Sequence, residues 1–335
     1  MHWEAQRGRF PRDPRLGHRP GLSYVPSAES RRQTLPDLYS TDDGYISLAD
    51  DCSNSKLQKD SNVVVLGGSV AMGLGASSNT STIASILNSL LSQNSIKLRV
   101  VNAACSAYCS WQELIKFALE ISRFRPPVVF SISSYNDFVH ASIGDRYTGK
   151  WHLNHDRSIE DLSDYLIGLN ENISITQLVK RKLLKNQLIK KIYTAYIGKV
   201  KRKPLSQGEV GWGYADSTFK TNNLSPGNYI HNMNQIKYLV EGYGGTFINV
   251  QQPLPALGSD SHLNSDYRRL CTIHKDLDTS IKLFYSTLDS LDTKNQRIIY
   301  NDFDASCFVD HCHLSDKGQK KLASNLLKLI QTSLK

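Results

Sequence analysis

The stretch Ser61-Asn62-Val63-Val64-Val65-Leu66-Gly67-Gly68-Ser69-Val70 decides the fold. It begins where some sixty polar residues, Arg-rich and then Ser/Asp-rich, give way to a continuous apolar run. A short run of β-branched and leucine residues that ends at two glycines is typical of a parallel strand buried on both faces. The sequence therefore predicts the first strand of a core, followed by a turn that carries Ser69.

Strand-like and helix-like segments alternate after this first strand. The further predicted strands are Leu98–Val101, Pro127–Ile132, Thr246–Val250 and Arg297–Tyr300. Apolar residues recur at helical spacing in the intervening segments, and Ser110 with Glu113 is expected to form a capping box at the start of one helix. Such alternation predicts right-handed crossovers, and therefore a parallel five-stranded sheet with helices on both faces.

The length of 335 residues favours one decorated domain. We expect an N-terminal arm, 1–60, that is extended or partly disordered, followed by a single domain, 61–335. The alternation stops after Asn136, so a helical insertion or lid is predicted at about 139–224.

Two compositional features limit the location of the protein. No apolar run approaches the roughly 18 residues that cross a bilayer. The Arg- and Pro-rich start lacks the apolar segment of a secretory signal, so a cytoplasmic location is predicted.

The six cysteines do not predict a disulfide scaffold in a chain of this length. Cys307, His311, Cys312 and His313 lie close together in sequence, but their spacing matches no zinc pattern. We therefore expect reduced thiols, no metal and no cofactor.

The formal charge of +9 is concentrated in one segment. Ten of the residues from Lys180 to Lys203 are Lys or Arg, interleaved with apolar residues at helical spacing. A solvated helical face on the insertion is the favoured interpretation, with peripheral contact to an anionic surface as the alternative. Nucleic acid is not expected, since no recognition motif accompanies the charge.

Three polar residues near the predicted strand ends can form a nucleophilic centre. A serine attacks a carbonyl only when a histidine takes its proton and a carboxylate orients that histidine. Ser69 follows the first strand, and Asp310 precedes His313 by three residues just before the last predicted helix. Loops after parallel strands meet at one edge of the sheet, so these side chains are expected to come together.

Other interpretations of the same residues remain open. Gly67 to Gly75 could be a plain turn or a phosphate cradle, although no Gly-Lys-Ser/Thr follows as in a P-loop. The turn is also not the Gly-x-Ser-x-Gly elbow of α/β-hydrolases. Asn136 follows the third strand and could donate to an oxyanion or simply form a turn.

Four short blocks resemble those of the SGNH (GDSL-like) hydrolases. They are Gly67-Gly68-Ser69, Asn102-Ala103-Ala104-Cys105-Ser106-Ala107, Ser134-Tyr135-Asn136-Asp137 and Asp310-His311-Cys312-His313-Leu314-Ser315 with the following Gly318. The resemblance implies a three-layer α/β/α, flavodoxin-like sandwich. It also implies Ser69 as nucleophile, His313 as base and Asp310 as its orienter. The oxyanion hole would comprise the N–H groups of Ser69 and Ala107 and the side-chain amide of Asn136.

The blocks depart from the family pattern at three positions. Gly68 replaces an aspartate, and Ala107 and Ser134 replace glycines. A backbone N–H survives the change from glycine to alanine, but positive φ becomes costly. Reduced or narrowed activity is one expected consequence.

The predicted function is hydrolysis of a carboxylic ester through an acyl-serine, with an acylated carbohydrate as one substrate class. Tyr135, Trp151 and Trp212 are candidate substrate-binding residues, since aromatic rings can stack on sugars. The alternatives are acyl transfer to a sugar hydroxyl and a catalytically silent module that binds a glycan. The sequence predicts no particular oligomeric state.

Overall fold

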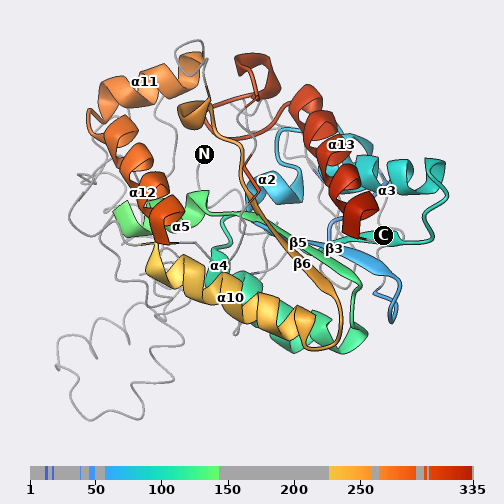
Figure 1. Cartoon of the computed structure of the whole chain (residues 1–335). Coiled ribbons are helices and arrows are strands. Elements are labelled where there is room, and N and C mark those ends of the chain that lie inside the picture. The colour runs from blue at the N-terminus through green and yellow to red at the C-terminus, as the bar shows by residue number, and fades with distance from the viewer. Residues whose placement is uncertain are drawn as a thin grey trace, which may run out of the picture. The chain divides into compact units, whose positions relative to one another are not determined.

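A four-stranded parallel sheet forms the centre of the fold in the computed structural model (Figure 1). The structure describes residues 12–13, 17–18, 38, 45–49, 57–142, 226–258, 264–291, 298–299 and 302–333. The strand order is β4-β3-β5-β6, and the strands are β3 (Asn62–Gly67), β4 (Arg99–Asn102), β5 (Val128–Ser133) and β6 (Thr246–Gln251). All three pairings are parallel, with Val64 opposite Val101 on one side and Val129 on the other.

Helices connect these strands. The helices are α2 (Ser69–Met72), α3 (Ile83–Gln93), α4 (Ser110–Lys116), α5 (Tyr135–Ser142), α10 (Gly227–Glu241), α11 (Ser265–Ile273), α12 (Leu277–Leu291) and α13 (Asp316–Ser333). A π-helical turn, η2 (Phe117–Ile121), continues α4. Short 3₁₀ turns are η1 (Asn79–Ser81), η3 (Ser122–Phe124), η5 (Pro255–Leu257) and η7 (Ala305–Cys307).

The two faces of the sheet are covered by different helix pairs. Figure 1 shows α3 and α13 on one side, and α10 with α4 on the other. Because side chains alternate along a strand, Val63 and Val65 belong to the apolar cluster under α3 and α13, whereas Val64 and Leu66 point to the opposite face. The predicted arrangement of helices on both faces of a parallel sheet is confirmed.

The face under α3 and α13 is apolar throughout. Leu87 of α3 and Leu326 of α13 are fully buried in the same cluster as the strand valines. We call this half of the domain, with α2 and the loop 309–313, the apolar side.

The face under α4 and α10 is polar towards the carboxyl ends of the strands. Ser131 and Ser133 of β5 alternate with residues of the apolar cluster and are buried. Glu113 and Lys116 on the inner face of α4 are each only 1% exposed. We call this half, with the loop 103–109 and α5, the polar side.

The start of α4 differs from the sequence prediction. Ser110 is the first helical residue and Cys109 is the N-cap, whose N–H donates to Gln112 Oε1 at 3.1 Å. The Ser110 and Glu113 side chains instead bond to Asp137 and Ser131 across the interior. The predicted capping box between Ser110 and Glu113 is therefore wrong, since both side chains have partners in other elements.

The fifth predicted strand is reduced to a single described position. Ile298 pairs in parallel with Val250 of β6, and its N–H and C=O bond to Asn249 O and Gln251 N, each at 2.9 Å. The predicted fifth strand thus contributes one pairing beside β6, and four strands rather than five make up the sheet within the described residues. At the other edge, Ile46 N donates to Asn102 O of β4 at 2.9 Å.

Several predictions fall largely outside the described residues. They are most of the arm 1–60, the insertion 139–224 apart from residues 139–142, and the basic segment Lys180–Lys203. Within the arm, β1 (Arg12–Asp13) and β2 (Gly17–His18) pair antiparallel. The first residues of the predicted insertion, 139–142, belong to α5.

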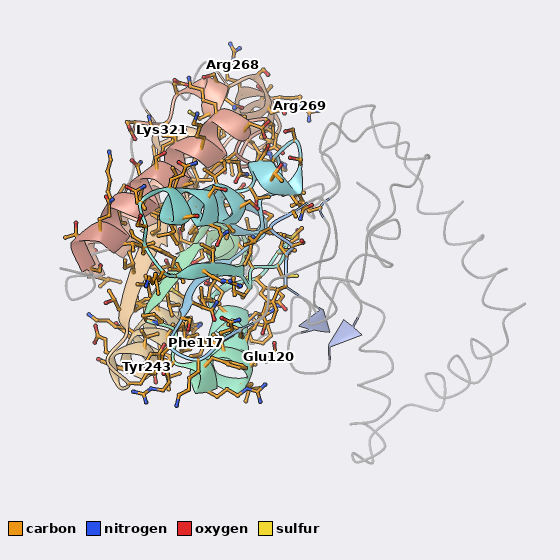
Figure 2. All side chains as sticks on the ribbon, turned by 90° about the vertical axis from the view of Figure 1, so that its right-hand side faces the viewer. Phe117, Glu120, Tyr243, Arg268, Arg269 and Lys321 are labelled. Carbon is orange, nitrogen blue, oxygen red and sulfur yellow. The ribbon has the colours of Figure 1, made fainter. Side chains whose placement is uncertain are left out.

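The ends of the domain are marked by charged and aromatic side chains. In Figure 2, Arg268 and Arg269 of α11 lie at the opposite end from Tyr243, which shortly precedes β6. Asn264, the N-cap of α11, donates to Asp310 O at 3.0 Å. Because Tyr243 precedes β6, it marks the amino end of the strands. The opposite end, where α11 lies, is therefore the carboxyl end of the sheet, where ligands bind in open parallel sheets. No helix in the described part of the chain is long and apolar enough to cross a membrane.

Candidate active site

A continuous hydrogen-bonded chain joins Ser69, His313 and Asp310. Ser69 Oγ lies 2.9 Å from His313 Nε2, and His313 Nδ1 lies 2.7 Å from Asp310 Oδ2. These are the two contacts that a serine nucleophile, its base and the orienting carboxylate require. The structure brings together the three residues that the sequence predicts as a triad.

The loop 309–313 fixes the carboxylate and the imidazole relative to each other. Val309 N donates to His313 O at 3.0 Å, which closes the loop. Asp310 Oδ1 accepts from the N–H groups of Cys312 and His313 at 2.9 and 2.8 Å. Because Oδ1 is held by the backbone, Oδ2 is left to orient the His313 ring.

Asp310 remains ionised in this environment. Burial by itself would raise its pKa, but the nearby His313 charge and hydrogen bond outweigh burial and hold the pKa of Asp310 well below its usual range. An ionised Asp310 favours the Nδ1–H tautomer of His313, in which Nε2 is free to accept the Ser69 proton.

The nucleophile is placed by the end of β3 and the first residue of α2. Gly67 has φ +140°, and a Cβ there would collide with the Ile132 carbonyl of β5 and with Ala71. Gly75 has φ +102° and packs against the carbonyl of Leu314, next to the base. These glycines thus permit close approach of neighbouring segments, and α2 with only four residues offers no long helix terminus for a phosphate.

His311 is buried beside the triad and is not its base. Its ring lies 6.4 Å from that of His313 and 6.2 Å from that of Tyr135, and Nδ1 has no hydrogen-bond partner among the residues that the structure describes. Burial lowers the pKa of His311. The His311 side chain is only 5% exposed and therefore does not lie on the surface.

A metal fits this loop poorly. Asp310, His311 and Cys312 place potential ligand atoms within 4.8 Å of one another. However, both Asp310 oxygens already serve the loop backbone and His313. A metal ion would compete with the triad for that carboxylate, so the predicted absence of metal stays our prediction.

Three N–H donors form the candidate oxyanion hole. Asn136, the second residue of α5, donates from Nδ2 to Tyr108 O at 2.7 Å, which leaves its second amide hydrogen for a ligand. No described residue accepts a hydrogen bond from the backbone N–H of Ser69 or Ala107. Cys105 N donates to Gly67 O at 3.1 Å and thereby ties the loop of Ala107 to the end of β3.

Gly68 sets the distance between the nucleophile turn and Asn136. A Cβ at position 68 would collide with Asn136 Nδ2 and lie 3.3 Å from Tyr108 O. Asn136 Nδ2 is held by Tyr108 O, so it could move away from such a Cβ only by breaking this hydrogen bond. The absence of a side chain at position 68 therefore leaves room for the Asn136 amide.

Two non-glycine residues near the candidate oxyanion hole adopt left-handed backbone conformations. Ala107 has φ +63° and Ser134 has φ +97°. A non-glycine residue in such a conformation costs about 1–3 kcal/mol, and the surrounding structure has to hold it there. Ser134 is anchored by a contact of 3.0 Å between its hydroxyl and that of Tyr285. The expected backbone cost is therefore present at both positions, while the Ala107 N–H is retained.

The aromatic residues predicted to bind substrate are mostly not described. Trp151 and Trp212 lie outside the described residues. Tyr135 is 6% exposed, with its ring 6.0 Å from that of Phe138. Its role in substrate binding remains a prediction.

The sequence did not predict that the carboxyl groups of Glu113 and Asp137 are both buried. Burial raises the pKa of Glu113 to about 8 and that of Asp137 to about 7. Ser131 Oγ donates to Glu113 Oε2 at 2.6 Å, and Ser110 Oγ donates to Asp137 Oδ1 at 2.5 Å. Both residues stand in the first turns of helices, where acidic residues are common, so the sequence carried no signal of their burial.

Comparison with solved structures finds similar folds among acylhydrolases and lipases. The crystal structure of TesA matches with a TM-score of 0.44 and 11% identity, covering 81% of this chain and 99% of that one. A lipase/acylhydrolase from Enterococcus faecalis matches with a TM-score of 0.41 and 12% identity, covering 81% and 96%. A putative GDSL-like lipase from Parabacteroides merdae matches with a TM-score of 0.42 and 10% identity, covering 83% and 98%.

No family model matches the chain, and no curated protein does.

Proposed function

We propose that the protein hydrolyses a carboxylic ester through an acyl-serine at Ser69. The observation that carries the proposal is the unbroken chain from Ser69 Oγ through His313 to Asp310, with contacts of 2.9 and 2.7 Å. A catalytically silent module would have no need to keep this chain of contacts. The triad contacts therefore support an enzyme rather than a binding module.

The acylation step follows from the geometry. Ser69 Oγ attacks the ester carbonyl carbon while its proton passes to His313 Nε2, and the carbonyl electron pair moves onto oxygen. The resulting oxyanion accepts from the N–H groups of Ser69 and Ala107 and from Asn136 Nδ2. Collapse of the tetrahedral intermediate breaks the bond to the alcohol, which leaves with the proton held by His313.

Deacylation repeats the same steps with water. His313 takes a proton from water, the hydroxide attacks the acyl carbon, and Ser69 Oγ leaves with that proton. Asp310 compensates the imidazolium charge in both halves of the reaction. No other group is needed to balance the protons.

Acyl transfer to an alcohol is the second candidate, favoured by the burial of the centre. Ser69 is 6% exposed and His313 only 2%. A buried acyl-serine is less accessible to bulk water, which favours an acceptor that binds next to it. An acylated carbohydrate would serve either reaction, and its sugar hydroxyl is the acceptor to test first.

The first test combines labelling with turnover. A serine-reactive fluorophosphonate should label the wild type at Ser69, as located by peptide mass spectrometry. The wild type should hydrolyse p-nitrophenyl esters, and Ser69→Ala and His313→Ala should lose at least about 10⁴-fold in kcat. Ser85→Ala, which alters another buried serine, is the matched control and should keep activity.

The results distinguish the candidates. Labelling at another serine, or equal rates in wild type and both triad variants, would contradict the proposal. Adding a sugar alcohol separates the two reactions, because an acyltransferase forms the new ester faster than the free acid.

A further inference from the structure

The loop that presents the Ala107 N–H is held from two adjacent residues of α5. Asn136 donates to Tyr108 O at 2.7 Å, one residue after Ala107. Asp137 accepts from Ser110, three residues after Ala107. Of these two residues, only Asn136 has a role in the proposed chemistry.

We propose that Asp137 is a positioning residue for the oxyanion hole, and that its grip on Ser110 keeps Ala107 in the left-handed conformation. This inference rests on the proposed function, because it assigns a task to the Ala107 N–H. It also explains how a chain with alanine at this position retains a usable donor there.

The contacts between Asp137 and Ser110 are numerous for one residue pair. The Ser110 N–H lies 3.3 and 3.2 Å from the two carboxylate oxygens of Asp137, and Ser110 Oγ lies 2.5 Å from Oδ1. Both residues are completely buried. Since a buried carboxylate without partners is very costly, this contact fixes where Ser110 lies relative to α5.

A third element completes the grip. Asn232 of α10 donates from Nδ2 to Ser110 Oγ at 2.9 Å. The hydroxyl therefore donates to Asp137 and accepts from Asn232, so its orientation is determined from both sides. We call Asp137, Ser110 and Asn232 the clamp.

Without the clamp, the strained backbone at Ala107 would favour a different conformation of the loop 103–109. Cys105 and Tyr108 are joined by a hydrogen bond of 3.1 Å, which leaves Ala107 inside a tight turn at φ +63°. Alanine prefers negative φ, and such a change would turn the peptide N–H away from its place. Glycine has no such preference, so a chain with glycine at this position would depend less on the clamp.

A simpler role for Asp137 makes a different prediction. Asp137 stands in the first turn of α5, where a carboxylate also stabilises the helix N-terminus. That role does not depend on the residue at position 107. The two roles are therefore separated by combining variants of both positions.

The experiment uses the full chain and a p-nitrophenyl ester that the wild type hydrolyses. Asp137→Ala should lower kcat by about 30-fold with KM within about twofold, as expected when a donor is displaced without loss of ground-state binding. Asp137→Asn keeps an acceptor for Ser110 and should lose about threefold. In an Ala107→Gly background, Asp137→Ala should lose less than about fivefold.

A second route guards against a variant that does not fold. Ser110→Ala removes the hydroxyl but leaves the carboxylate, and it should lower kcat in the same background-dependent way. Ser131→Ala is the matched control, because it removes a serine-to-carboxylate bond of 2.6 Å to the same helix without touching the loop. It should keep kcat within about twofold.

Hydrogen exchange of the loop provides a readout independent of catalysis. Amides of residues 103–110 should exchange faster in Asp137→Asn and Ser110→Ala than in the wild type and Ser131→Ala. Unchanged exchange in this loop would overturn the clamp, and so would an equal loss of kcat in the Ala107 and Ala107→Gly backgrounds. Faster exchange in a protein whose wild type is neither labelled nor active would support the clamp while contradicting the proposed function.

Discussion

The two sides of the sheet support the two halves of the candidate site by different means. On the apolar side, α3 and α13 pack on strand valines, and the triad residues stand at the edge of that cluster. On the polar side, Ser110, which follows the oxyanion loop, bonds to the carboxyl group of Asp137 and the amide of Asn232, and Glu113 of the same helix bonds to Ser131. Apolar packing tolerates small shifts, whereas a buried polar network is stable only when each of its members has a partner.

This difference predicts how the two sides respond to substitution. Changes in the apolar side should affect stability in proportion to the lost volume, with small effects on the reaction. Changes at the contacts that hold the oxyanion loop, those of Asn136 and Asp137, should affect the reaction more than stability, because these contacts set the geometry of the donors. The experiments below test that division.

The largest effect is expected for Asp310→Asn. The amide cannot stabilise the imidazolium and favours the wrong His313 tautomer, so kcat should fall by about 10⁴-fold. Circular dichroism and thermal unfolding should show that the variant is folded. A loss in kcat below about tenfold would mean that Asp310 does not orient His313. The apolar side would then not supply a complete triad.

Asn136→Ala should follow, with a fall in kcat of about 10²–10³-fold and little change in KM. Gly68→Ala should lower kcat in the same direction, because the added Cβ displaces Asn136 Nδ2. The matched control is Asn94→Ala, whose amide bonds only at the end of α3 and of α13. Equal activity of Asn136→Ala and wild type would contradict the role of the polar side.

Leu326→Ala tests the apolar side by itself. Leu326 lies on the inner face of α13 and is fully buried, so the variant should lose about 3 kcal/mol of unfolding free energy, measured by urea denaturation. Its kcat should stay within about threefold of wild type at a temperature where it is folded. Lys328→Ala on the exposed face of the same helix should change neither. A large loss of kcat in folded Leu326→Ala would break the division between the two sides.

Glu113→Gln tests the polar side through pH. Burial raises the pKa of Glu113 to about 8 from 4.5, so the folded protein holds a proton there that the unfolded chain loses near pH 4 to 5. The unfolding free energy should therefore fall by up to about 1.4 kcal/mol per pH unit from pH 5 to 8 because of this group. Asp137, whose pKa burial raises to about 7, adds in the same direction.

The variant should show a flatter dependence over that range, measured by denaturant unfolding at fixed pH steps. Asp276→Asn, which changes an exposed carboxylate, should keep the wild-type slope. An unchanged slope in Glu113→Gln would mean that Glu113 is ionised in the folded protein. The polar side would then contain a buried negative charge at Glu113.

The sequence was sufficient for the apolar side and the triad. Val63 to Leu66 is an apolar run ended by glycines, and the four strands β3 to β6 lie within one residue of the predicted ranges. The triad followed because loops after parallel strands converge, and because Asp310 and His313 lie three residues apart in one loop. These are local signals that do not depend on distant packing.

The polar side could not be predicted in the same way. Glu113 reads as a capping residue and Asp137 as a helix-start residue, since sequence spacing does not reveal a partner on another element. The partners of Ser110 lie 27 and 122 residues away, on α5 and α10. The short parallel contact at Ile298 was predicted as a full strand for a related reason, because pairing with β6 and not composition decides its length.

The separation of Ser69 and His313 by 244 residues has a consequence for the newly made protein. At the roughly 5–20 residues per second of protein synthesis, the nucleophile is made about 10 to 50 s before its base. During that interval the serine hydroxyl has no base and remains chemically inert. Ser69 of a growing chain is therefore not acylated by the esters it meets near the ribosome. The serine becomes a nucleophile only when the loop that carries His313 has docked.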